Sequence, residues 1–242
     1  MNNLNIVIPM AGLGDRFRKK GFTVDKPLID INGNHMIELV LDSLGLKGDF
    51  IFIINNKSKN SEKLKSVLKN KSVNCKIIEI DYITDGPAST CLLAEKYINN
   101  DKPLLITNCD QIMKWDSNNF EDFIQNTKAD GVVVTYNTLT EKNSYVKLDG
   151  EGHAIEFAEK KIISEHSLNG IHFWKHGKDF INSTKSMIDK NIRVNGEFYI
   201  APTFNEMVKL GKKIITYKID KNNHWAVGTP EDLLLYLKDG NT

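Results

Sequence analysis

The chain has 242 residues, with 32 basic and 31 acidic side chains and a formal net charge of +1. Because phosphate contacts dominate affinity for nucleic acids, this balance argues against a protein whose main task is binding nucleic acid. With 40% hydrophobic and 26% charged residues, the composition is that of a globular protein rather than a disordered or fibrous one. A chain of this length can bury one large core, so we expect a single domain over residues 1–242.

The sequence carries no sign of a membrane segment or of secretion. No run approaches the ~20 apolar residues that span a bilayer, and the N-terminus lacks the basic segment of a signal peptide. The three cysteines, Cys75, Cys91 and Cys109, are widely spaced and match neither a metal-binding pattern nor a disulfide framework. We therefore expect no membrane partner and a location in the reducing cytoplasm.

The first half of the chain repeats the order strand, loop, helix. Continuous apolar runs, typical of strands that are buried on both faces, occupy residues 4–9, 50–54, 75–80 and 103–107. Apolar residues at helical spacing predict helices over 36–44, 58–68 and 88–98. This alternation predicts a parallel sheet with helices on both faces, which is an α/β fold.

The second half is mixed and reads as an addition to the edge of the first sheet. The predicted strands cover 131–136, 144–148, 153–158, 171–174 and 213–219, and the second and third of them form a hairpin around 149–152. The predicted helices cover 178–189, 202–210 and 230–237. The sequence shows no internal repeat and no linker, so both halves are expected to form one domain.

A glycine loop follows the first predicted strand. Gly12 and Gly14 stand where backbone amides can approach a phosphate closely. The dinucleotide fingerprint needs a third glycine where Phe17 stands, and the P-loop needs a final Gly-Lys-Ser/Thr that is absent. Neither motif fits, and the glycines alone also suit a plain strand exit that uses their backbone freedom.

Cations gather around this loop. They are Arg16, Arg18, Lys19, Lys20 and Lys26. Lys19 and Lys20 fit an ordinary solvated face, but glycines with cations at the end of strand one occupy the place where open α/β sheets bind ligands. We therefore predict a triphosphate ligand. Because Lys26 precedes a proline, its backbone is expected to be extended.

Six motifs occur in a fixed order along the chain. They are Gly12-x-Gly14-x-Arg16 followed by Lys26-Pro27, then Gly86-Pro87-Ala88, Asn108-Cys109-Asp110, Glu159-Lys160 with Asn169-Gly170, Gly196-Glu197-Phe198-Tyr199, and Gly228-Thr229-Pro230. Together they resemble the motifs of the sugar-phosphate nucleotidyltransferases, in which a proline stands at the position of Asp25. Each motif is weak by itself, but six in order over the whole chain are a strong resemblance.

The resemblance implies a Rossmann-like three-layer sandwich around a mostly parallel, mixed central sheet, the nucleotide-diphospho-sugar transferase fold. Residues 1–110 would form a nucleotide-binding lobe and residues 111–242 an acceptor-binding lobe. In the implied reaction, the phosphate of a sugar 1-phosphate attacks the α-phosphorus of a nucleoside triphosphate and pyrophosphate leaves. This chemistry asks for positioning and positive charge rather than a covalent nucleophile. The implied use of the product is surface polysaccharide synthesis.

The resemblance also assigns residues to roles. Arg16 would neutralise the β- and γ-phosphates, and Lys26 would stabilise the α-phosphorus centre. The residues expected at the nucleotide are Met10, Ala11, Gly12, Leu13, Gly14, Asp85, Gly86, Pro87, Ala88 and Asn108. The residues expected at the acceptor are Glu159, Lys160, Gly170 and Glu197. The aromatic residues Trp174, Phe198, Tyr199 and Trp225 are expected in the core.

The expected cofactor is Mg²⁺. Asp110 follows a buried strand, where a carboxylate can bind magnesium together with phosphates and water, although a turn or helix cap is the alternative role. Members of the family commonly carry a second aspartate where this chain has Ala226. Either Asp110 holds the metal without another carboxylate, or a residue such as Asp220 or Glu197 substitutes.

Three other functions fit parts of the sequence. The first is a cytidylyltransferase that acts on a non-sugar phosphate such as phosphocholine. The second is a glycosyltransferase of related fold, although such enzymes usually show Asp-x-Asp where this chain has Asn108-Cys109-Asp110. The third is a nucleotide sensor without turnover, which Ala226 favours and Arg16 and Lys26 oppose. The base, the acceptor and the oligomeric state stay open.

Overall fold

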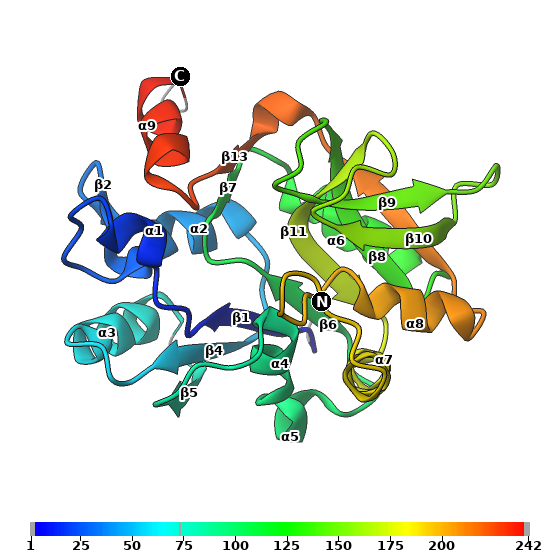
Figure 1. Cartoon of the computed structure of the whole chain (residues 1–242), viewed down its shortest axis with the longest axis horizontal. Helices are drawn as coiled ribbons and strands as arrows, with labels where there is room; N and C mark the ends of the chain where they lie inside the picture. Colours follow the sequence, from blue (N-terminus) through cyan, green and yellow to red (C-terminus); the bar gives the residue numbers. More distant parts are fainter. Residues whose placement is uncertain (1–2, 73, 240–242) are drawn as a thin grey trace.

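The computed structural model describes residues 3–72 and 74–239. Within these residues nine strands form one central sheet, in the order β10-β9-β11-β6-β1-β4-β5, with β8 paired to β11 and β12 paired to β8 (Figure 1). The strands are β1 (Asn5–Met10), β4 (Asp49–Asn55), β5 (Lys76–Ile80), β6 (Leu104–Thr107), β8 (Gly131–Asn137), β9 (Ser144–Leu148), β10 (Ala154–Glu159), β11 (His166–Trp174) and β12 (Ile214–Lys218).

The strand directions divide the sheet into two parts. β1 is parallel to β4 and β6, and β4 is parallel to β5. β11 is antiparallel to β6 and β8, so the second half joins the first as a mixed extension. The predicted α/β class and the mixed central sheet are confirmed. Because β1, β4, β5 and β6 run the same way, their carboxyl ends meet at one edge of the sheet.

Helices cover both faces, and β1 shows why. Ile6 and Ile8 belong to one hydrophobic cluster and Val7 to another, because successive side chains of a strand point to opposite faces. The first cluster includes residues of α2 (Met36–Leu44), α3 (Ser61–Lys71), α6 (Ser117–Asn126) and α9 (Pro230–Asp239). The second includes residues of α4 (Pro87–Leu92), α5 (Glu95–Ile98), α7 (Gly177–Asp189) and α8 (Thr203–Lys209). These two layers and the sheet make the predicted three-layer sandwich.

One predicted helix is split. The stretch 88–98 forms α4 and α5, because the amides of Leu93 and Ala94 bond carbonyls only three residues back, at 3.1 Å each. Apolar periodicity could not show this break, since Cys91, Ala94 and Ile98 are all buried on either side of it. The expected strand 171–174 begins earlier, at His166. The added residues include two polar ones, Ser167 and Asn169, which are buried and hydrogen-bonded.

Several short elements were not predicted. They are α1 (Asp15–Arg18), the 3-10 helices η1 (Lys26–Leu28) and η2 (Lys221–Asn223), the hairpin of β2 (Asp30–Ile31) and β3 (Asn34–His35), the small antiparallel sheet of β7 (Gln111–Met113) and β13 (His224–Ala226), and the amphipathic helix α6. All three cysteines are free thiols. Among the described residues, no helix combines the length and the apolar character needed to cross a membrane.

We predict that His172 makes the protein sensitive to acid. The ring lies in β11 beside the stacked rings of Trp174 and Phe204, and burial lowers its pKa from 6.5 to about 4. The unfolded chain therefore binds this proton first as the pH falls below 6.5, so the free energy of unfolding decreases. Between about pH 7 and about pH 4.5 the loss should be roughly 2–3 kcal/mol.

Urea unfolding of His172→Phe and the wild type at both pH values checks this prediction. The stability of the variant relative to the wild type should rise by that amount on acidification. His166→Gln, at the start of the same strand, is the matched control for the loss of a histidine. An unchanged difference between His172→Phe and the wild type at the two pH values would contradict it.

Candidate functional site

The glycine loop leaves β1 at Met10 and turns into α1. Gly14 starts this helix in the left-handed conformation (φ 66°), which glycine adopts without strain, and its carbonyl accepts the N–H of Phe17 at 3.0 Å. Phe17 is only 1% exposed and anchors the short helix in the core. Its neighbour Arg16 lines the cavity in front of the loop.

A cavity of about 400 Å³ lies at the carboxyl edge of the parallel strands. It is bounded by the loops that follow β1 and β6 and by the segments that precede α4 and α9. The expected nucleotide residues on its wall are Met10, Ala11, Gly12, Gly14, Gly86, Pro87 and Asn108. The other expected site residues on its wall are Arg16, Lys26, Asp110 and Glu197. The fold therefore gathers most of the expected residues around one space.

Lys26 and Asp110 form an ion pair in this cavity, although they are 84 residues apart in the chain. Nζ of Lys26 donates to Oδ2 of Asp110, and the two side chains are only 15% and 16% exposed. Burial alone would lower the pKa of Lys26, but the carboxylate of Asp110 and the nearby Cys109 outweigh it and raise that pKa. The ammonium group is thus held charged at the place where the glycine loop faces the end of β6.

The pre-proline rule predicted an extended backbone for Lys26, and this prediction is wrong. Lys26 is the first residue of η1, and the extended residue is Asp25 (φ −63°, ψ 144°). Pro27 lies in the first turn of η1, where its missing N–H costs no hydrogen bond, while Leu28 N–H donates to the carbonyl of Asp25 at 2.8 Å. Pro27 and Leu28 are buried, and their packing fixes the backbone position of Lys26.

The segment Gly228-Thr229-Pro230 closes a third side of the pair. A Cβ on Gly228 would lie 2.6 Å from Oδ2 of Asp110, so only glycine leaves room for that carboxylate. The amide of Val227 donates to the carbonyl of Asp110 at 2.9 Å, which holds the segment in place. Thr229 then begins α9, because its hydroxyl accepts the N–H of Asp232 at 3.1 Å. The Gly-Thr-Pro motif thus combines a close approach with a helix start.

The donor set around Asp110 fits a magnesium ion only if the substrate supplies the other ligands. Among the described residues, no group of three or more His, Cys, Asp or Glu side chains could hold a metal. Ala226 lies opposite Gln111 in the small sheet and has no ligating atom on its side chain. Asp220 accepts the N–H of Asn222 at 2.8 Å and does not line the cavity, whereas Glu197 does. One carboxylate with phosphate oxygens and water is a normal Mg²⁺ environment.

Three of the expected nucleotide residues lie outside this cavity. Asp85 is 63% exposed and pairs with Arg193, with Oδ2 at 2.8 Å from Nη2. Ala88 is the second residue of α4 and is fully buried in the core. Leu13 lines a neighbouring cavity instead. The motif containing Asp85 and Ala88 therefore lines the cavity with Gly86 and Pro87. The side chain of Asp85 forms an ion pair instead, and that of Ala88 packs in the core.

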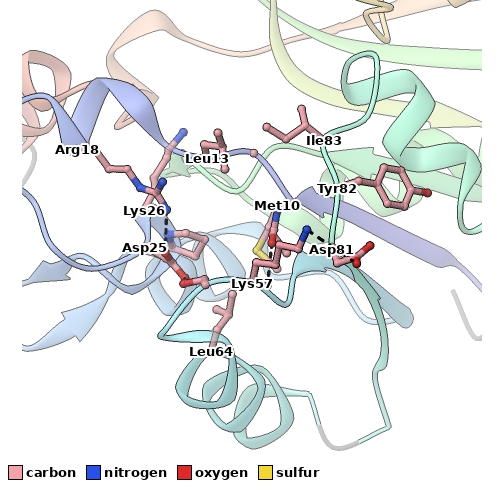
Figure 2. Close-up of a pocket in the computed structure, with 14 residues that line it drawn as sticks. Met10, Leu13, Arg18, Asp25, Lys26, Lys57, Leu64, Asp81, Tyr82 and Ile83 are labelled. Atoms are coloured by element: carbon pink, nitrogen blue, oxygen red, sulfur yellow. Dashed lines mark hydrogen bonds and ion pairs between the residues drawn. The ribbon is translucent and has the colours of Figure 1, made fainter.

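The neighbouring cavity measures about 340 Å³ and lies at the ends of β1, β4 and β5 (Figure 2). Figure 2 shows Leu13 and Ile83 on one side of it and Leu64 on the other. Its polar wall includes Asn55, Lys57 and Asp81, and an ion pair of 4.0 Å joins the last two. It adjoins the first cavity, because Met10, Gly12, Lys26, Pro27 and Ile83 line both.

The sequence analysis did not predict the polar residues that line this neighbouring cavity. Asn55 ends β4, and Asp81 follows β5 directly. The signal that singled out Asp110, a polar residue at the end of a buried parallel strand, applies to both of them as well.

The residues expected at the acceptor form a second polar group. Glu159 ends β10 and accepts a hydrogen bond from the hydroxyl of Ser144, while burial raises its pKa. Lys160 follows with a left-handed backbone (φ 53°). Gly170 does not face open space, because a Cβ there would lie 2.4 Å from Nδ2 of Asn108. Its role in the structure is to admit Asn108, and Glu159, Lys160 and Gly170 lie outside both cavities.

Tyr199 was expected in the core and instead contacts Lys160. Nζ of Lys160 donates to the hydroxyl of Tyr199 and lies 4.4 Å from the centroid of its ring. Burial, with further contributions from Glu197 and Glu159, raises the pKa of Tyr199, so the phenol stays protonated. The signal that could have indicated a role for Tyr199 in the site was its place in the motif Gly196-Glu197-Phe198-Tyr199. Trp174 and Phe198 are buried as expected, and Trp225 packs partly buried against the core.

The model of the nucleotidyl transferase family matches residues 6–238, which is almost the whole chain. The chain belongs to the nucleotidyl transferase family. This confirms the family that the six motifs resembled, and with it the class of enzyme.

Relatives of this nucleotidyltransferase differ in length and in chemistry. It is 28% identical over 235 residues to the bifunctional protein GlmU of Methanocaldococcus jannaschii, covering 96% of this chain and 53% of that one. The chain thus spans about half the length of the curated relatives it matches. The fold matches the nucleoside-diphosphate-sugar pyrophosphorylase of Vibrio cholerae RC9, with a TM-score of 0.82, 22% identity and coverage of 96% and 99%. It also matches the inositol-1-phosphate CTP transferase of T. maritima, with a TM-score of 0.75, 15% identity and coverage of 98% and 96%.

For the nucleotidyltransferase we predict that Gly228→Ala is far more damaging than a surface glycine change. The new methyl group would meet Oδ2 of Asp110 at 2.6 Å and push the carboxylate away from Lys26. Such overpacking costs about 1–3 kcal/mol of stability, and a displacement of about 1 Å in the site lowers turnover roughly a hundredfold. Gly150→Ala is the control, because nothing lies within 4 Å of its Cβ. Equal turnover of both variants in a pyrophosphate-release assay would show that Asp110 is free to move.

Proposed function

We propose that the protein transfers a nucleoside monophosphate from a nucleoside triphosphate to the phosphate of a sugar 1-phosphate, releasing pyrophosphate. The observation that carries this proposal is the shielded Lys26–Asp110 pair on the wall of a cavity that also presents Gly12, Gly14 and Arg16. A cation fixed beside a carboxylate and open backbone amides is what an anionic phosphorus centre requires.

In the proposed reaction each cation meets a different phosphate. The amides of the glycine loop would hold the triphosphate, since no side chain covers Gly12. Arg16 would face the β- and γ-phosphates, where the leaving pyrophosphate gathers charge. Lys26 would stay beside the α-phosphorus and stabilise the charge that develops during in-line attack. Mg²⁺, held by Asp110 and phosphate oxygens, would supply further neutralisation of the triphosphate.

The base is proposed to lie where the two cavities adjoin. Met10, Gly12 and Ile83 line both spaces, and Gly86 and Pro87 complete the wall of the first. Ile83 is 62% exposed and offers an apolar surface for a flat ring. We also propose a cytoplasmic location, in keeping with three free thiols and with substrates that are nucleoside triphosphates.

The acceptor is proposed to lie between Glu197 and the pair Glu159 and Lys160. Lys160 would hold its phosphate, and the carboxylates would accept hydrogen bonds from its hydroxyl groups. The hydroxyl of Tyr199 accepts a hydrogen bond from the amino group of Lys160, and the face of its ring lies against that group. We propose an activated sugar for surface polysaccharide as the product, because the acceptor motifs resemble those of sugar-phosphate enzymes.

A second candidate is a cytidylyltransferase with a small non-sugar phosphate as acceptor. The observation that favours it is the acidic character of the acceptor side, where Glu159 and Glu197 interact electrostatically and could hold an amine. A glycosyltransferase is disfavoured, because it would have no use for the paired Lys26 and the cationic glycine loop. A sensor without turnover is disfavoured by the same two features.

Pyrophosphate release with each of CTP, UTP, dTTP, ATP and GTP, Mg²⁺ and a panel of sugar 1-phosphates, phosphocholine and other phosphorylated metabolites tests the proposal. We expect one triphosphate and one acceptor class to give turnover. Lys26→Ala should lower kcat at least a hundredfold while the protein stays folded by circular dichroism. Absence of pyrophosphate with every pair, or full activity of Lys26→Ala, would refute the proposed function.

Gly12→Ala separates ligand approach from folding. Nothing lies within 4 Å of a Cβ at Gly12, and its φ is not in the left-handed region, so the thermal stability should stay at the wild-type value. If the triphosphate lies on the loop, the methyl group would hold it away, and the KM for nucleotide should rise about tenfold or more. Gly150→Ala is again the matched control. An unchanged KM would place the triphosphate elsewhere.

A further inference from the structure

Arg193 lies in the loop between α7 and α8, and its guanidinium group makes four contacts. Nε donates to Oδ1 of Asn191 at 2.7 Å, Nη1 to the carbonyl of Gly196 at 2.8 Å, and Nη2 to Oδ2 of Asp85 at 2.8 Å. The group also lies 3.9 Å from the ring centroid of Phe198. One side chain therefore ties its own loop together and fastens that loop to the segment before α4.

Backbone hydrogen bonds join the same two segments. The amide of Phe198 donates to the carbonyl of Asp85 at 2.7 Å, and the amide of Ala88 donates to the carbonyl of Phe198 at 3.0 Å. Gly86 lies between them with φ 120°, and a Cβ there would meet the nitrogen and oxygen of Phe198 at 2.7 and 2.6 Å. The segments touch so closely that a shift of one must move the other.

These two segments carry neighbouring parts of the wall of the candidate site, since a Cβ on Gly86 would lie 3.1 Å from Cβ of Glu197. Gly86 and Pro87 line the cavity proposed for the nucleotide, and Glu197 lines it from the other segment. Tyr199, two residues further, holds Lys160 on the acceptor side. The join at Phe198 thus sets the position of the acceptor wall relative to the nucleotide wall.

Within the loop, the backbones of Val194 and Glu197 exchange two further hydrogen bonds of 3.0 Å each, and the side chain of Phe198 is buried. Asn191 and Asn195 have left-handed backbones, with φ of 51° and 49°, which cost free energy unless their surroundings fix them, whereas Gly196 (φ 84°) adopts this conformation without strain. Arg193 donates hydrogen bonds to the side chain of Asn191 and to the carbonyl of Gly196. A lysine could not replace it, because a single ammonium group lacks the planar fork that reaches three acceptors in one plane.

We propose that Arg193 is a positioning residue that couples the nucleotide wall to the acceptor wall, so that binding of the triphosphate orders the loop that presents Glu197 and Tyr199 to the acceptor. The coupling follows from the juxtaposition of Arg193, Asp85 and Phe198, and its ligands rest on the proposed function. Nucleotide contact at Gly86 and Pro87 stabilises the segment to which the acceptor loop is fastened.

Hydrogen exchange of the ligand-free protein tests the structural part without any substrate. In Arg193→Ala the amides of Ala88 and Phe198 should exchange at least tenfold faster than in the wild type, while those of Ile106 and Val132 in the central sheet keep their rates. Arg193→Lys should behave nearly like Arg193→Ala. Lys185→Ala is the control. It removes an exposed ion pair between Lys185 on α7 and Glu95 on α5, and it should change the exchange rates of neither pair of amides. Wild-type exchange in Arg193→Ala, equal acceleration of all amides, or full rescue by lysine would overturn the proposal.

Kinetics test the coupling. With the triphosphate that supports pyrophosphate release, Arg193→Ala should raise the KM for the acceptor at least tenfold. Saturating triphosphate should slow exchange at Phe198 and Tyr199 in the wild type and leave it unchanged in Arg193→Ala. An unaltered acceptor KM, or equal slowing in both proteins, would contradict the coupling. A wild type without turnover would count against the proposed function, and the ligand-free exchange experiment would still decide the role of Arg193.

Discussion

The ion pair between Lys26 and Asp110 is the interaction on which the geometry of the candidate site depends. A shielded charge that loses its partner destabilises a protein by about 3–5 kcal/mol, so each of the two side chains holds the other in place. Three parts of the fold converge on the pair. Pro27 and Leu28 are buried behind the lysine, the turn between β6 and β7 carries the aspartate, and Gly228 approaches the carboxylate where any larger residue would collide.

The sequence was informative wherever a residue type left one structural choice. The apolar runs at 4–9, 50–54 and 103–107 are typical of strands covered on both faces, and parallel strands bring their carboxyl ends to one edge. This rule agrees with the family resemblance, which implied that the loop of Gly12 and Gly14 and Asp110 belong to one site. The same rule, applied to the ends of β4 and β5, would also have found Asn55 and Asp81 on the second cavity.

Other features depended on contacts that no local pattern encodes. Arg193 and Asp85 are 108 residues apart, and their contact is set by a loop with three left-handed residues. Tyr199 was predicted to be a core aromatic residue, because the sequence does not show that Lys160, at the end of a strand, contacts it. Lys26 read as extended, because the pre-proline rule describes a steric preference that buried packing of Pro27 and Leu28 overrides.

The replacement of a second carboxylate by Ala226 changes what Lys26 must do. With Asp110 as the metal-binding carboxylate of the proposed site, the side chain of Ala226 on strand β13 could not orient it, because that side chain has no polar atom. Lys26 supplies that orientation, because its Nζ binds one carboxylate oxygen and has two further N–H groups. One ammonium group can therefore hold Asp110 and still meet an incoming phosphate. In the proposed site, Asp110 would keep its other oxygen for a cation that arrives with the triphosphate. The ammonium group and the carboxylate would then act as a single unit, which would explain why the fold shields both and leaves the glycine loop beside them open.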